Sequence, residues 1–74
     1  MKVSVKYIKD GLNKKGIKTK GIKTNLLKSF YRGKEIDLLF DGDSIILTED
    51  YCCFYYIFND KEALKTISSY IHSI

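Results

Sequence analysis

The 74-residue sequence contains no proline, no tryptophan, one histidine and only two cysteines. Its longest uninterrupted apolar run, residues 51–58, is less than half of the ~20 residues that a membrane-spanning helix needs. Lysines interrupt the first thirty residues, so no apolar leader segment is visible there. We therefore expect the chain to stay in the cytoplasm and not to enter a membrane.

The two cysteines, Cys52 and Cys53, are adjacent, and this spacing argues against a disulfide or a metal site. A disulfide between neighbours would close a strained ring, because ordinary disulfides separate the two Cα atoms by about 5.5–6 Å. Redox and metal-binding cysteines usually occur as CxxC pairs, and no histidine lies nearby. We interpret both cysteines as small apolar residues and predict neither a metal nor a cofactor.

Residues that could carry catalysis are scarce. His72 is the only histidine, and no nucleophile and acid can be placed around it as a catalytic set. No glycine-rich phosphate loop follows a predicted strand. The carboxylates form two groups at opposite ends of one predicted strand, roughly 15 Å apart, which is too far for a single metal site. A chain this short buries only about 60% of its unfolded surface, so we predict a protein without enzymatic activity.

Charge is divided sharply along the chain. Residues 1–34 carry eleven basic residues and one acidic residue, whereas residues 35–60 carry seven acidic residues and no basic one. Such asymmetry points to charged partners, although packing of the basic half beside the acidic half within one molecule explains it equally well. Twelve of the thirteen basic residues are lysine, a preference typical of AT-rich genomes such as those of low-GC bacteria and their phages.

The N-terminal segment has two interpretations. Alternation of apolar and polar residues over 2–7 suits a strand. A helix over about 5–15 is favoured by Ser4 as its N-cap, and by Gly16 and Ile17 at its end, where Ile17 would pack back on the helix. Gly11 inside this helix costs roughly 1 kcal/mol relative to alanine.

Two identical five-residue units, KGIKT, occupy residues 15–24. We predict a basic loop or irregular strand there, with its two isoleucines as apolar anchors. Residues 25–31 are interpreted as a short helix that ends at Gly33. A strand over 27–31 that turns at Arg32 and Gly33 is the alternative.

The rest of the chain predicts a three-stranded antiparallel meander. Strands are expected over 35–40, 44–48 and 51–58, with a hairpin turn at Asp41-Gly42-Asp43 and a second turn at Glu49-Asp50. Asn59 is the expected N-cap of a final amphipathic helix that packs on the sheet. The predicted fold is therefore one small α+β domain over 1–74, made of the basic segment 1–34, the acidic meander 35–58 and the C-terminal helix 59–74.

The strand 51–58 is apolar on both faces, whereas an antiparallel strand with one wet face should alternate with polar residues. Either the N-terminal helix covers the second face, or that face contacts another molecule. We predict a small interaction protein, an inhibitor or regulator of the phage or mobile-element type, that docks on a larger host protein or nucleic-acid-handling complex. A homodimer through Tyr51–Phe58 is also possible. The candidate residues are Tyr51, Tyr55, Tyr56, Asp41, Asp43, Glu49 and Asp50.

The alternative function is binding of nucleic acid through the basic half. Phosphate contacts need only positive charge and reach, and Phe30 and Tyr31 could stack on bases. One arginine among thirteen basic residues argues for reading of the phosphate backbone, because readout of base edges favours arginine. The candidate residues are Lys14, Lys15, Lys18, Lys20, Lys23, Lys28 and Arg32.

Overall fold

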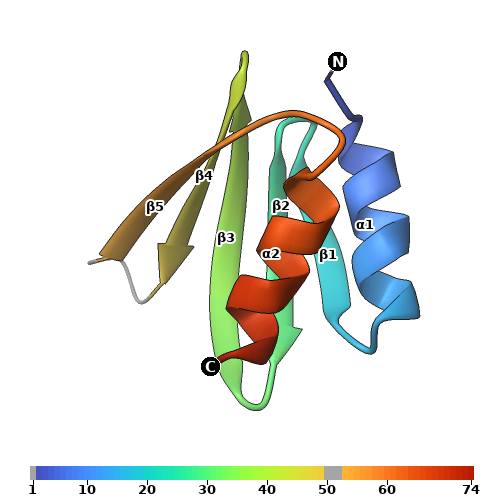
Figure 1. Ribbon diagram of the computed structural model, residues 1–74. Coiled ribbons are helices and arrows are strands. Elements are labelled where there is room, and N and C mark those ends of the chain that lie inside the picture. The colour runs from blue at the N-terminus through green and yellow to red at the C-terminus, as the bar shows by residue number, and fades with distance from the viewer. Residues whose placement is uncertain (1, 50–52) are drawn as a thin grey trace.

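The computed structural model describes residues 2–49 and 53–74, in which two helices lie on one face of a five-stranded sheet (Figure 1). The elements are α1 (Val5–Lys14), β1 (Lys18–Lys23), β2 (Leu26–Tyr31), β3 (Lys34–Asp41), β4 (Ser44–Glu49), β5 (Cys53–Phe58) and α2 (Ala63–His72). All neighbouring strands are antiparallel, in the order of the chain. The α+β class is confirmed, but the prediction of three strands is wrong. No helix among the described residues has the length and apolar character needed to cross a membrane.

The N-terminal segment forms helix α1, so the strand over 2–7 is wrong. The Ser4 hydroxyl accepts a hydrogen bond from the Tyr7 N–H at 3.0 Å and caps the first turn. At the other end Gly16 has φ 82°, and the Ile17 N–H donates to the Leu12 carbonyl at 3.0 Å. This is the closure expected of a Schellman motif, and it places Ile17 in the core.

The short helix predicted over 25–31 is wrong, and the alternative strand is confirmed, because 26–31 form β2 and 18–23 form β1. In β2 the buried positions alternate, but one of them is the polar Ser29, which obscures the two-residue period. The Ser29 hydroxyl donates to the Ile36 carbonyl of β3 at 2.8 Å, so it is satisfied inside the core. Arg32 (φ 51°) and Gly33 (φ 79°) make the tight turn between β2 and β3. Gly33 therefore turns a hairpin and does not end a helix.

The two KGIKT units have different environments, although their sequences are identical. Ile17 is fully buried, whereas Ile22 is 43% exposed and lies where the pairing of β1 with β2 shifts register between Gly21 and Lys23. Ile17 precedes β1 and closes the end of α1, whereas Ile22 lies at the irregularity in β1, so the second unit does not repeat the packing of the first. The prediction that both isoleucines anchor this segment holds for Ile17 only.

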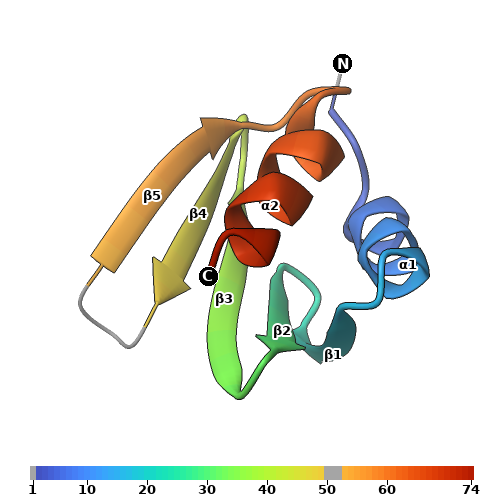
Figure 2. The ribbon, with the colours of Figure 1, turned by 60° about the horizontal axis from the view of Figure 1, so that its bottom comes forward.

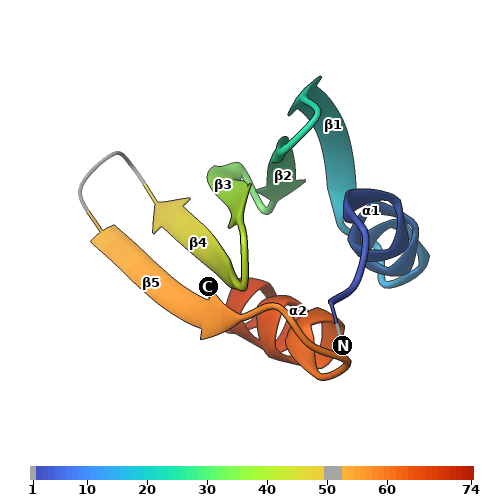
Figure 3. The same ribbon diagram turned by 90° about the horizontal axis from the view of Figure 1, so that it is seen from above.

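The sheet curls around the helices, as Figures 2 and 3 show. Helix α2 lies over the middle of the concave face, and α1 lies beside it near β1 (Figure 3). One apolar core joins the two helices to the inner face of the sheet. Its buried members are Ile8, Leu12, Ile17, Leu27, Ile36, Leu38, Phe40, Ile45, Leu47, Ala63, Ile67 and Ile71.

The predicted turn Asp41–Asp43 is confirmed, because Asp41 of β3 pairs with Ser44 of β4. The turn at Glu49-Asp50 and the first two residues of the strand 51–58 fall partly or wholly outside the described residues. Asn59 does not cap α2, contrary to the prediction. Its side-chain oxygen accepts the Val3 N–H at 2.9 Å, so this buried side chain ties the N-terminal segment to the chain after β5.

Candidate protein-interaction surface

The face of the sheet turned away from both helices is apolar around β5, and we call it the open face. Three β5 side chains alternate onto it: Phe54, Tyr56 and Phe58, with exposed fractions of 61%, 65% and 78%. The strand register places Ile46 of β4 beside Tyr56, and Leu39 of β3 beside Ile46. The open face therefore carries a continuous apolar surface whose most exposed part is the row of rings on β5.

Helix α1 does not cover this surface, so the alternative that it shields the second face of β5 is wrong. Both helices pack on the concave side of the sheet, and α1 lies at the β1 end, far from β5 (Figure 3). The helix side of β5 is itself only partly covered, since Tyr55 is 46% exposed. Both faces of the strand thus remain accessible in the monomer.

The two edge strands of the sheet differ in their protection. On β1, Lys18, Lys20 and Lys23 are exposed, and the strand is bulged. Charged side chains and bulges of this kind prevent the edge from pairing with another strand. Strand β5 has no basic residue and no proline, and it pairs with β4 without a register shift. The edge of β5 is therefore the one suited to accept an additional strand.

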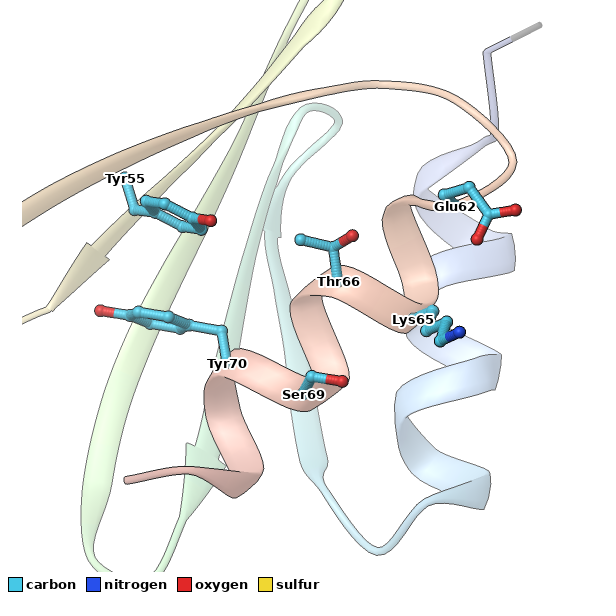
Figure 4. Close-up of a pocket in the computed structure, with 6 residues that line it drawn as sticks. All are labelled: Tyr55, Glu62, Lys65, Thr66, Ser69 and Tyr70. Atoms are coloured by element: carbon cyan, nitrogen blue, oxygen red, sulfur yellow. The ribbon is translucent and has the colours of Figure 1, made fainter.

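On the helix side of β5, a cleft of about 570 Å³ separates the strand from α2 (Figure 4). The rings of Tyr55 and Tyr70 stack at 5.3 Å with an interplanar angle of 14°, and the Tyr70 hydroxyl donates to Glu49 at 3.1 Å. Burial raises the pKa of Tyr70 above its ordinary value, and the hydrogen bond to Glu49 adds to the shift. Besides the tyrosines, the cleft is lined by Glu62, Lys65, Thr66 and Ser69.

None of these helix residues is among the candidates predicted from the sequence. From the sequence alone, the Tyr70 ring gives no indication of a stacking partner. The spacing of Thr66, Ser69 and Tyr70 at three to four residues is the available signal, because it places all three on one side of a helix. That signal does not reveal which strand the side faces.

The acidic candidates lie at both ends of β4, and two of them form ion pairs with lysines of the same molecule. Asp43 is 3.2 Å from the Lys2 ammonium, and Glu49 is 3.6 Å from that of Lys34. Asp41 is exposed at the β3–β4 hairpin. Tyr51 and Asp50 lie outside the described residues. The acidic and basic halves of the chain therefore pair with each other, which accounts for part of the charge split.

The basic candidates are spread over α1, β1, β2 and the β2–β3 turn, and the strand register sets Lys20 directly opposite Lys28. Lys14 and Lys15 lie at the end of α1, and Lys28 is held on β2 between Glu35 at 3.5 Å and Asp37 at 3.8 Å. Lys18 and Arg32 do come together, with Phe30 and Tyr31, around a cleft of about 370 Å³ that Gly16 and Gly33 complete. The Arg32 guanidinium lies 5.5 Å from the Tyr31 ring centre.

His72 contributes to the packing at the end of α2. Its Nε2 lies 3.1 Å from the Lys15 carbonyl, and its ring centre is 5.1 Å from that of Tyr31. Within residues 2–49 and 53–74, no three or more His, Cys, Asp or Glu side chains gather as metal ligands would. In comparisons with known proteins, no family model, curated protein or solved structure matches this chain. Its function is therefore inferred from its geometry.

Proposed function

We propose that this chain is a small non-enzymatic interaction protein that docks on a larger cytoplasmic protein through β5 and the adjoining open face. An inhibitor or regulator of the phage or mobile-element type fits its size. The observation that carries the proposal is the row of three aromatic rings, each more than 60% exposed, on one edge strand. Exposed apolar surface of this kind marks interaction sites on folded proteins, and tyrosine is among the residues that dominate binding energy.

The size of the aromatic row indicates how it would bind. An aromatic side chain buries about 150–250 Å², so the exposed parts of Phe54, Tyr56 and Phe58 offer roughly 400 Å². At about 25 cal/mol per Å², their burial contributes roughly 10 kcal/mol. That gain only matches the estimated 4–15 kcal/mol lost when two molecules associate. A stable complex therefore needs further contacts, which the adjoining open face around Ile46 and Leu39 supplies.

The proposal is tested by capture from lysates of low-GC bacteria with immobilised protein. The test variant carries Phe54→Ser, Tyr56→Ser and Phe58→Ser. A matched control changes three exposed residues of the opposite edge, Lys18→Gln, Lys20→Gln and Lys23→Gln. We expect the native protein and the control to retain the same stoichiometric partner and the test variant to lose it. Equal retention by all three proteins, or no partner from several hosts, contradicts the proposal.

A second candidate function, binding of phosphate backbone, is favoured by the cleft that brings Lys18 and Arg32 beside Phe30 and Tyr31. Cations attract phosphates and adjacent rings stack on bases, which are the two elements of single-strand binding. A gel shift at about 50 and 200 mM salt should show the steep loss of affinity that several phosphate contacts produce. Lys18→Glu combined with Arg32→Glu should abolish the shift. If the double variant still shifts the nucleic acid in the gel, this cleft is not the binding site.

A further inference from the structure

We infer that β5 pairs with β5 of a second copy of this chain, antiparallel and around a two-fold axis that passes beside Tyr56. The inference rests on the proposed function, because it uses the same strand, and it deepens it. Pairing along the edge leaves the open face accessible, so the docking surface would be one continuous sheet made by two copies.

The direction of the backbone groups selects this register. The Asn59 N–H donates to the Asp43 carbonyl of the neighbouring hairpin at 2.7 Å. Successive residues of an antiparallel strand point their N–H and C=O groups to opposite sides, so Phe54, Tyr56 and Phe58 point theirs toward the free edge. These three residues are centred on Tyr56. A two-fold axis there pairs Tyr56 with itself and Phe54 with Phe58 of the second copy, and every outward group of the three obtains a partner.

The same register matches the side chains. Residues directly opposite each other in a sheet lie on the same face, so this axis continues the open face of one copy into the open face of the other. It sets Tyr56 against Tyr56 and Phe54 against Phe58, and cross-strand aromatic pairs stabilise such contacts. A shift by one residue would place the rings of one copy opposite helix-side residues of the other.

Nothing in the described part of the chain obstructs this pairing. The sheet ends at β5, and neither helix lies beyond its edge (Figure 3). Glu49 of one copy and Asp43 of the other would lie three strand spacings apart across the axis, roughly 14 Å. That separation exceeds the screening length of about 8–10 Å, and each carboxylate already has a lysine partner. Repulsion between these two carboxylates is therefore weak.

The area available predicts a weak dimer. Each copy offers roughly 400 Å² of exposed aromatic surface, of which lateral pairing covers a part, together with the backbone of one strand. The total lies near the ~1,000 Å² at which specific interfaces begin. We therefore expect a monomer–dimer equilibrium with a dissociation constant in the micromolar range.

Cysteine cross-linking tests the register. In a background with Cys52→Ser and Cys53→Ser, Tyr56→Cys should form an intermolecular disulfide, because Cα atoms of opposite residues at about 5.5 Å suit one. Phe54→Cys alone should not, since the two copies of residue 54 would be roughly 14 Å apart. Mixing Phe54→Cys with Phe58→Cys should give the mixed disulfide. A dimer in which Phe54→Cys cross-links to itself and Tyr56→Cys does not overturns the register.

Sedimentation between about 10 μM and 1 mM tests the dimer itself. Tyr56→Pro removes an N–H that points away from β4, so the fold should persist while the dimer is lost. Tyr56→Lys places like charges across the axis and should have the same effect, which covers the case in which the proline variant fails to fold. A native protein that stays monomeric at about 1 mM, or a dimer unaffected by Tyr56→Lys, overturns the inference. Capture of a larger protein by the monomer would still support the proposed function.

Discussion

Replacing Gly11 by alanine should destabilise this protein, although the same change stabilises most helices. Alanine is favoured over glycine inside a helix by about 0.8–1.0 kcal/mol. In this fold Gly11 of α1 faces Leu64 of α2, and an added Cβ would lie 2.7 Å from Leu64 Cδ1 and 3.1 Å from Leu64 Cγ. Overpacking of this kind typically costs about 1–3 kcal/mol. We therefore expect Gly11→Ala to lower the free energy of unfolding by about 1 kcal/mol, because the steric cost exceeds the gain in helix propensity.

A double-mutant cycle with Leu64→Ala separates the two effects. Once the Leu64 side chain is shortened, the atoms that meet the new Cβ are absent, and Gly11→Ala should stabilise by about 1 kcal/mol. The coupling free energy between the two sites should then be about 2 kcal/mol. Urea denaturation of the four proteins, followed by circular dichroism, measures it. If Gly11→Ala has the same effect in both backgrounds, the two helices do not approach each other at Gly11 and the reasoning is refuted.

Three further predictions concern single contacts. Arg32→Asn should raise the free energy of unfolding by about 0.5–1 kcal/mol, because asparagine tolerates positive φ better than arginine; a lower melting temperature would show that the guanidinium–ring contact outweighs the backbone strain. Asn59→Ala should cost about 1–3 kcal/mol by leaving the Val3 N–H without its acceptor, and an unchanged urea midpoint would contradict this role. The raised pKa of Tyr70 stabilises the fold fully below about pH 10, the ordinary tyrosine value, and this contribution is lost as the pH rises through the folded-state value. NMR titration of the Tyr70 ring should show a lower pKa in Glu49→Gln, and an unchanged pKa would exclude the Glu49 hydrogen bond as a cause.

Prediction from sequence was most reliable where a structure depends on neighbours in the chain. Helix α1 is bounded by Ser4 and Gly16, whose capping roles follow from side-chain and backbone chemistry within one turn. The Asp41–Asp43 hairpin follows in the same way from turn residues between alternating strands. The exposure of β5 was predicted in part, since a strand that is apolar on both faces needs another surface to pack against each face.

Prediction failed where the partner lies on another segment of the fold. Ser29 reads as a surface residue until the Ile36 carbonyl of β3 is placed beside its hydroxyl. Asn59 has the sequence context of a helix cap, yet its side-chain oxygen binds the Val3 N–H, 56 residues away. In both cases a short polar side chain satisfies a backbone group of another segment, seven residues away for Ser29 and 56 for Asn59. Local sequence patterns contain no information about such partners.

The amino-acid sequence by itself determined the ends of α1, the central hairpin and the split of charge, because each depends on residue type or on spacing within a few positions. Only the tertiary structure decided between helix and strand for residues 26–31, placed both helices on one face, and left Phe54, Tyr56 and Phe58 uncovered. These outcomes depend on which surfaces pack together, and burial of the apolar inner face around Leu27 and Ile36 outweighs the weak local preference for a helix.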